Sequence, residues 1–286
     1  MSLSPPVAVL IATRDREALL TARSLPSVLA QSHQPDVVTI VNDGRPFTSE
    51  LRRELTSSSS NAEVVLLCNR RAPGVAGAWN TGLAHLWGQG HRGFIAILDD
   101  DDEWDHEHLQ ANATAVTQPG INVVVSGLRM AVAGAEQPRP LIQTLTERDF
   151  LIGNPGWQGS NTFVTLPLLA AVGGFREGLQ SLNDRDLALR LLRNPQTRWA
   201  LVERWTATWH RDTPSSLSLP DSPAKLSGLR WFWQIYASEM TVREEEEFFS
   251  RAERLFAIPR HRIVEGTIDR SPNHRALGDL DVDADQ

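Results

Sequence analysis

Cysteine is nearly absent from this sequence. Cys68 is the only one in 286 residues, which excludes an intramolecular disulfide and a zinc site built from cysteines. No apolar run reaches the length of a membrane-spanning helix. Residues 1–6 also lack the basic segment that opens a signal peptide. Together these features predict a protein of the cytoplasm.

The sequence also has fewer basic residues than acidic ones. The chain has 28 Lys and Arg against 35 Asp and Glu, a net charge of −7, so we expect no nucleic-acid partner. Only one tyrosine accompanies nine tryptophans. Tryptophan can stack on sugars or bases, but packing in a core is its commoner use. The 41% of hydrophobic residues is ordinary for a globular protein, and the length suits one large α/β domain or two small ones.

Short apolar runs alternate with helical patterns over the first hundred residues. The runs predict buried strands, and the patterns between them predict helices. This β-α-β order indicates an α/β fold with a mixed, mostly parallel sheet flanked by helices and joined by right-handed crossovers. The predicted strands are 7–12, 37–41, 63–68 and 94–98, and the predicted helices are 17–31 (with a break at Pro26), 48–55 and 76–88.

The pattern changes after residue 104. Strands are predicted at 122–130, 162–164 and 199–208, and helices at 109–117, 167–172, 186–192 and within 225–255. We therefore expect a catalytic domain over 1–223, with halves at about 6–104 and 105–223, a helical extension over 224–272, and an acidic disordered tail over 273–286.

Four consecutive aspartates, Asp99 to Asp102, follow the fourth predicted strand, and Glu103 comes next. Adjacent carboxylates repel one another, and the carboxyl ends of strands are where open α/β sheets bind ligands. Oxygen donors suit Mg²⁺ or Mn²⁺, so the cluster predicts a metal–diphosphate site. The alternative is a solvated acidic loop. We expect Asp99 to Asp101 to face the ligand, and Asp102 and Glu103 to begin the turn and the next helix.

Other metal and phosphate motifs do not match. An EF-hand loop that starts at Asp99 would need Gly and Glu where Trp104 and Gln110 stand. The sequence contains no P-loop, no His-Glu-x-x-His zinc motif and no Gly-x-Ser-x-Gly elbow.

Five blocks of sequence together resemble the glycosyltransferases of family 2, which have the GT-A (Rossmann-like nucleotide-diphospho-sugar transferase) fold. They are an opening strand and turn, a Val-Asn-Asp-Gly turn, an Asn-rich helix start, the aspartate cluster and an acceptor-half segment. In sequence these are 7–16, 41–44, 69–82, 98–104, and 173–177 with 183–190. The chain departs from the family pattern at four positions, which are Ala12, Asn42, Trp79 and Asn183.

The resemblance implies a role for each motif residue. Asp101 and Asp99 would hold the metal, with the late His210 near it. Asp184 would be the general base, with Asp186 as a more structural runner-up. Eight residues would contact the nucleotide-sugar, and Asp99 would contact both the nucleotide-sugar and the metal. The eight are Ala12, Thr13, Arg14, Asp43, Arg71, Asn80, Asp99 and Asp100.

The resemblance implies an inverting, metal-dependent transfer of a sugar from a nucleotide-diphosphate donor. UDP is the first expectation, with GDP and dTDP as alternatives, and Mn²⁺ or Mg²⁺ is the expected cofactor. The acceptor would be a carbohydrate or small-molecule hydroxyl.

Two other interpretations of the sequence stay open. A nucleotidyltransferase would carry a glycine-rich loop after its first strand, and the turn at 13–16 has no glycine. An inactive family member would act as a binding module, as the departures at Ala12, Asn42, Trp79 and Asn183 allow.

Overall fold

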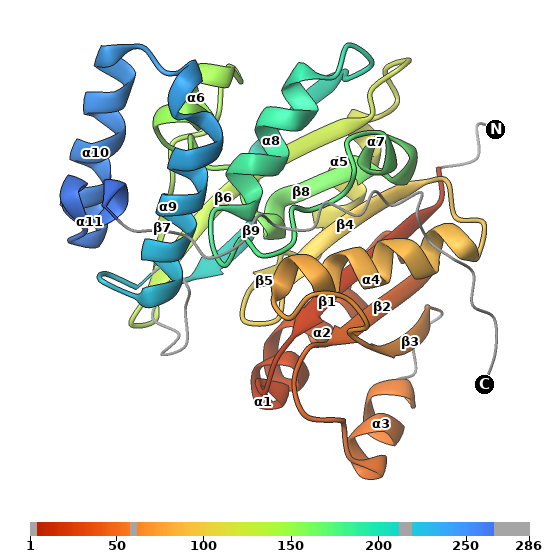
Figure 1. The fold of residues 1–286 in the computed structure, drawn as a ribbon. Coiled ribbons are helices and arrows are strands. Elements are labelled where there is room, and N and C mark those ends of the chain that lie inside the picture. The colour runs from red at the N-terminus through yellow and green to blue at the C-terminus, as the bar shows by residue number, and fades with distance from the viewer. Residues whose placement is uncertain (1–4, 58–61, 212–218, 266–286) are drawn as a thin grey trace.

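The computed structural model describes residues 5–57, 62–211 and 219–265 (Figure 1). One twisted sheet runs through the molecule in the order β3-β2-β1-β4-β8-β6-β9-β5, and β7 adds to β6. The strands are β1 (Val7–Thr13), β2 (Val37–Asn42), β3 (Glu63–Cys68), β4 (Phe94–Asp99), β5 (Glu103–Trp104), β6 (Val123–Val132), β7 (Ala135–Pro138), β8 (Thr162–Thr165) and β9 (Trp199–His210).

The first four strands form the parallel half of the sheet. In the register, Ala12 lies beside Asp99, Thr13 beside Asn42, and Asn42 beside Cys68. The carboxyl ends of all four strands therefore lie side by side, and this end of the four strands is called the parallel edge below. Every residue of β1 is buried, as a strand covered by helices on both faces requires.

The other half of the sheet is mixed. β8 runs antiparallel to both β4 and β6, whereas β6 and β9 are parallel with a bulge around Gly127. A Cβ at Gly127 would lie 2.6 Å from the carbonyl oxygen of Arg204, so the backbones approach too closely there for a larger residue. This half extends the sheet past β4, on the side away from β3.

The helices differ from the sequence-based expectation at a few points. The predicted break in 17–31 lies before Pro26, because five π-helical residues separate α1 from α2 and Pro26 falls in the first turn of α2. α6 was not predicted, since its six residues are too few to show a period. The helices are α1 (Glu17–Leu19), α2 (Leu25–Leu29), α3 (Ser49–Thr56), α4 (Val75–Gly88), α5 (His108–Ala115), α6 (Glu147–Ile152), α7 (Leu166–Ala171), α8 (Asn183–Arg193), α9 (Pro223–Tyr236), α10 (Val242–Phe256) and α11 (Arg260–Val264).

The turn after the aspartates also differs. Asp102 and Glu103 were expected to lead into a helix, but Glu103 and Trp104 form β5 and pair with Thr208 and Ala207 of β9. Trp104 is 5% exposed, and its Nε1 donates to the Ser160 carbonyl oxygen at 2.6 Å. Burial of this indole holds the segment against the sheet, and α5 begins only at His108.

Alternate residues of β1 contribute to two apolar layers, one on each face of the sheet. Val7, Val9 and Ile11 pack with residues of α2 and α5. Ala8 and Leu10 belong to a larger layer that also contains residues of α4, α8, α9 and α10. Figure 1 shows α9, α10 and α11 gathered beside α6 at the end of the sheet away from β3.

The C-terminal helices thus share a core with the sheet, and the domain boundary near residue 223 stays a prediction. The predicted acidic tail, 273–286, lies outside the described residues. Within the described ranges, no helix is long and apolar enough to cross a membrane.

Candidate active site

Asp43, the first residue after β2, fixes the loop that leads into α4. Its carboxylate accepts hydrogen bonds from Gly74 N at 2.8 Å and from Asn69 Nδ2 at 2.6 Å. Its side chain is only 7% exposed, and Arg14 Nη1 lies 3.6 Å from Oδ2. Gly74 has a φ of 119°, a conformation that favours glycine. Asp43 and Arg14 therefore lie together at the ends of β2 and β1, and their contact with a nucleotide-sugar stays a prediction.

Arg16 neutralises part of the aspartate cluster. Its guanidinium lies 2.6 Å from Asp100 Oδ1 and 2.7 Å from Asp101 Oδ2. Asp100 is fully buried and Asp101 is 9% exposed. Arg23 Nη1 donates to the Asp101 carbonyl oxygen at 2.6 Å. Two arginines from the segment after β1 thus hold the turn that follows β4.

One guanidinium does not balance these carboxylates. Burial, together with the neighbouring charges of Asp101 and Asp100, raises the pKa of Asp99 to about 7. Burial also raises the pKa of Asp100 to about 6, although Arg16 opposes this shift. The folded protein therefore stores unfavourable negative charge at this turn, which a bound cation would relieve.

Asp102 is turned into the protein. It is fully buried, its Oδ2 accepts from Ser160 Oγ at 2.5 Å, and its Oδ1 accepts from His210 N at 2.9 Å. Ser160 Oγ also lies 3.2 Å from Asp99 N. Asp102 therefore ties β4, β9 and the turn before β8 together, and burial raises its pKa above the ordinary value.

His210 lies near the cluster but faces away from the cavity described below. Its Nε2 is 2.8 Å from Glu103 Oε1, and its ring does not line that cavity. The flanking residues Trp209 and Arg211 do line it, because successive side chains of a strand point to opposite faces. The metal role of His210 stays a prediction, and Arg211 is a cavity residue that the sequence reasoning missed.

Asp184 stands in the first turn of α8. Its Oδ2 accepts from Asn154 Nδ2 at 2.8 Å and its Oδ1 from Arg185 N at 2.9 Å. Burial raises the pKa of Asp184, while Lys225 and Arg185 oppose the rise. Asn154 is itself fixed, because its Oδ1 accepts from Gly156 N and Trp157 N, each at 2.8 Å. The carboxylate is therefore held in one orientation by a rigid loop.

A cavity of about 380 Å³ brings the two halves of the sequence together. Asp99 and Asp101 from the end of β4 line it with Asp184 from α8. Trp79 and Asn183 also line it. Their Nε1 and Oδ1 atoms are buried without a hydrogen-bond partner among the described residues.

Of the eight residues predicted to contact the nucleotide-sugar, only Asp99 lines this cavity, and two of the others, Asn80 and Arg71, have partners elsewhere. Asn80 is 1% exposed; its Nδ2 donates to the Phe175 carbonyl oxygen at 2.8 Å and to Glu177 Oε1 at 2.9 Å, and its Oδ1 accepts from Phe175 N at 2.9 Å. Arg71 forms a largely buried ion pair with the same Glu177. Both side chains join α4 to the segment before α8, and their contact with a sugar stays a prediction.

The end of β1 lies beside the ends of β2 and β4, and most of it is covered. Ala12 is 7% exposed and Thr13 is 3% exposed, whereas the Arg14 side chain is 63% exposed. The backbone of Thr13 accepts from Asp43 N at 2.8 Å. Of these three predicted contacts, Arg14 has the side chain free to reach a ligand.

The sequence reasoning also missed several basic residues of the cavity. Arg16 and Arg185 lie within the blocks 7–16 and 183–190, but no role was predicted for either. Arg139, Lys225 and Arg251 lie outside every motif, in segments far apart in the chain.

A divalent cation fits the carboxylates at this edge. Asp99 and Asp101 offer oxygen donors to the cavity, and burial, followed by the charges of Asp101 and Asp100, raises the pKa of Asp99. Over the described parts of the chain, no group of three or more His, Cys, Asp or Glu is arranged to hold a metal ion alone. Mg²⁺ commonly takes only one or two carboxylates and completes its shell with phosphate oxygens and water. The donor set therefore suits an ion shared with a diphosphate.

Comparisons with known proteins agree with this geometry. The family described as glycosyl transferase family 2 matches residues 8–182. The S. aureus TarS 1–349 structure in complex with UDP-GlcNAc is similar, with a TM-score of 0.62 at 18% identity, over 89% of this chain and 74% of that one. The mannosyltransferase PcManGT from Pyrobaculum calidifontis, in complex with GDP-Man and Mn²⁺, has a TM-score of 0.53 at 16% identity, over 89% and 70%.

No curated protein matches the chain. At these identities the two structures establish the fold, a GT-A-like mixed α/β architecture, and the family match covers more than half of the sequence. The chain belongs to glycosyl transferase family 2 and is a glycosyltransferase.

Proposed function

We propose that this enzyme transfers a sugar from a nucleoside-diphosphate donor to an acceptor hydroxyl, in a metal-dependent reaction that inverts the anomeric carbon. One observation carries the proposal. Asp99 and Asp101, at the end of a strand, and Asp184, at the start of a helix, line the same cavity. Such an arrangement suits a cation-bound diphosphate on one side and proton removal on the other.

The donor would lie across the parallel edge. Asp43 can accept from the imide of uracil or from the N1–H of guanine, and Arg14 beside it can reach the ribose or a phosphate. The similar structures contain UDP-GlcNAc, UDP and GDP-Man, which supports UDP first and GDP second. When bound between Asp99, Asp101 and the diphosphate, Mn²⁺ or Mg²⁺ would act as a Lewis acid that stabilises the leaving group.

Asp184 would be the general base. The acceptor oxygen attacks the anomeric carbon, the bond to the diphosphate breaks, and the hydroxyl proton passes to the Asp184 carboxylate. Burial raises the pKa of Asp184, which makes the carboxylate a better proton acceptor than a solvated one. Its bonds to Asn154 and Arg185 N keep it oriented before the acceptor arrives.

Calorimetric titration with UDP, GDP and dTDP, each with and without Mn²⁺, tests the donor half of the proposal. We expect one nucleotide to bind at least about tenfold more tightly with the metal, and Asp101→Asn to remove that difference. Glu107→Gln is the control, because the Glu107 side chain is exposed and pairs with Arg204 on the surface. If none of the three nucleotides bound in a metal-dependent way, the proposed function would be wrong.

A further inference from the structure

The part of the cavity around Asp184 carries an excess of positive charge. Arg139 follows β7, Lys225 lies in the first turn of α9, and Arg251 lies in α10, and all three line the cavity with Asp184. Within the described ranges, the guanidinium groups of Arg139 and Arg251 have no carboxylate within ion-pair distance. Asp184 therefore shares this part of the cavity with these three cations and with Arg185, whose guanidinium donates to the Phe150 and Leu151 carbonyl oxygens.

The electrostatics of these groups agree with the geometry. Burial and the charges of Arg139 and Arg254 lower the pKa of Arg251. Burial lowers the pKa of Arg139 as well, with Asp184 opposing the shift. Burial lowers the pKa of Lys225 to about 8, and Asp184 again opposes it. Because arginine stays protonated at neutral pH despite such shifts, the positive charge here is real and uncompensated.

The cations are also built into the structure. Lys225 is 4% exposed, its Nζ donates to Ser181 Oγ at 2.7 Å, and it lies 4.6 Å from the ring centroid of Phe256. A Cβ at Gly153 would lie 3.0 Å from Arg251 Nε, so the glycine leaves room for the guanidinium. These contacts are specific, unlike those of a solvated basic surface.

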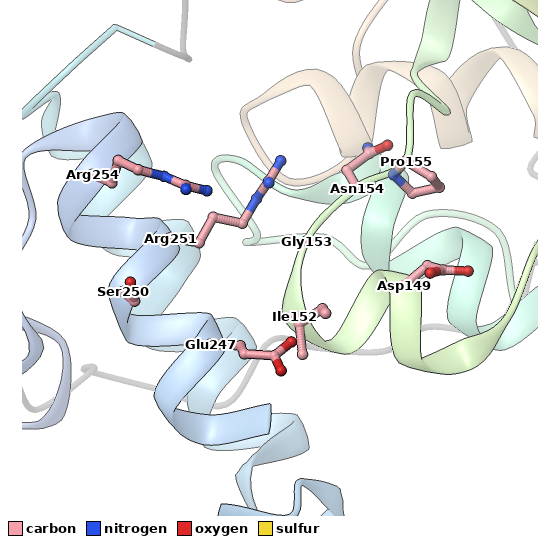
Figure 2. A pocket seen from close by; sticks show the side chains of 9 residues that line it. All are labelled: Asp149, Ile152, Gly153, Asn154, Pro155, Glu247, Ser250, Arg251 and Arg254. Carbon is pink, nitrogen blue, oxygen red and sulfur yellow. The ribbon is translucent and has the colours of Figure 1, made fainter. Parts of the chain in front are cut away.

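A second hollow adjoins the main cavity. It has a volume of about 370 Å³ and shares Gly153, Asn154 and Arg251 with that cavity. Arg254 lines it, together with the carboxylates of Asp149 and Glu247. Figure 2 shows Arg251 and Arg254 extending from α10 toward the loop that carries Gly153 and Asn154. The loop that orients Asp184 through Asn154 is therefore the same loop that Arg251 approaches.

We propose that the acceptor of this enzyme is anionic: it carries a phosphate or carboxylate group near the hydroxyl that receives the sugar, and Arg139 and Arg251 bind that group. Guanidinium groups bind phosphate and carboxylate through paired hydrogen bonds, and two of them beside the base would place the neighbouring hydroxyl on Asp184. This inference rests on the proposed function for the identity of the reaction.

The test is a binding measurement with three probes that share a sugar ring. Glucose 6-phosphate, glucuronate and glucose are titrated into the protein, both alone and saturated with nucleotide and Mn²⁺. We expect one of the two anionic probes to bind at least about tenfold more tightly than glucose. Tighter binding of glucose 6-phosphate would identify phosphate as the group that the site prefers, and tighter binding of glucuronate would identify carboxylate.

Variants identify the groups responsible. Arg251→Gln and Arg139→Gln should each weaken the anionic probe about tenfold or more, leave glucose unchanged and leave the nucleotide affinity unchanged. Arg243→Gln is the matched control, because it removes the same charge from α10 where the side chain is 83% exposed and paired with Glu247. Arg251→Lys keeps the positive charge but loses the planar guanidinium group that makes paired hydrogen bonds, so it should keep only part of the affinity for the anionic probe.

Three results would overturn the inference. The first is that glucose binds as tightly as both anionic probes. The second is that both glutamine variants bind the anionic probe as tightly as the wild type. The third is that both variants lose nucleotide affinity instead, which would assign the two arginines to the donor diphosphate. If no nucleotide bound at all but the anionic probe still depended on Arg139 and Arg251, the proposed function would fail while the anion site stood.

Discussion

At the scale of single residues, two aspartates in the first turn of α8 have opposite surroundings. Asp184 lines the cavity and bonds to Asn154 and a backbone amide. The Asp186 side chain is fully buried; Arg176, Tyr236 and Arg190 donate to it at 2.9, 2.8 and 2.7 Å. Burial alone would raise the pKa of Asp186, but Arg190 and Arg176 hold it below the ordinary value. We therefore expect one aspartate to act in catalysis and the other in stability.

Replacing each aspartate by asparagine separates the two roles. Asp184→Asn should lower kcat by about 10²-fold or more, with the nucleotide affinity and the unfolding midpoint unchanged. Asp186→Asn should lower the free energy of unfolding by about 3 kcal/mol, since it leaves buried arginines without their partner. Transfer assays and urea unfolding of both variants check this. Near wild-type transfer in Asp184→Asn would rule out the base assignment.

The pH profile gives a second readout on the same residue. A base works only when it is deprotonated, so kcat should rise with pH through the pKa of Asp184. That pKa lies above the ordinary value of 3.8, and the acidic limb of the profile should therefore lie above it as well. The residual activity of Asp184→Asn should lack this limb.

At the scale of elements, α4 depends on glycine at one position and tolerates it at another. A Cβ at Gly77 would lie 1.9 Å from the carbonyl oxygen of Ala72, in the loop that Asp43 holds through Gly74. A Cβ at Gly88, the last residue of the same helix, would meet nothing within 4 Å. The N-terminal end of α4 thus packs against its own entry loop, and its C-terminal end is open.

Alanine at each position tests this packing. Gly77→Ala should destabilise the protein by about 1–3 kcal/mol, because the clash is with backbone and the loop must move. Gly88→Ala should be neutral or stabilise by up to about 1 kcal/mol, as alanine favours helix. Denaturant unfolding measures both. The nucleotide affinity of Gly77→Ala should fall as well, since the shifted loop carries the amide that Asp43 binds.

Elements also show what periodicity could and could not predict. The strands of the parallel half were predicted almost residue for residue, since each is a nearly continuous apolar run, although β1 is buried throughout and β3 is only partly covered. α6 and β7 were missed, being six and four residues long. β5 was missed because pairing with β9, a hundred residues later, outweighs the local turn signal of the acidic run.

At the scale of the whole molecule, the C-terminal helices and the sheet form one core. Phe232 of α9 is fully buried and belongs to the apolar layer that includes Leu10 of β1. The centroid of its ring lies 4.1 Å from the guanidinium carbon of Arg185. Tyr236 of α9 bonds to Asp186 of α8. The extension therefore supports the helix that presents the proposed base, and it contributes Lys225 and Arg251 to the cavity.

Phe232→Ala tests whether this core unfolds as a unit. We expect a loss of about 3–5 kcal/mol and one transition that coincides by tryptophan fluorescence and circular dichroism. Val242→Ala on α10, at a side chain 74% exposed, should change little. Two separate transitions, with the sheet stable after the helices unfold, would show that the extension is an independent domain.

The sequence by itself determined the α/β fold, the parallel edge, and the resemblance that the family match confirmed, because these depend on local apolar runs and on motifs written in contiguous residues. It could also place Asp99, Asp101 and Asp184 in one site through their motifs. Only the tertiary structure decided that Asp102 turns inward, that Asn80 and Arg71 join elements, and that Arg16 pairs with the cluster. It alone brought Arg139, Lys225 and Arg251 around Asp184, since electrostatic neighbours far apart in the chain leave no pattern in the sequence.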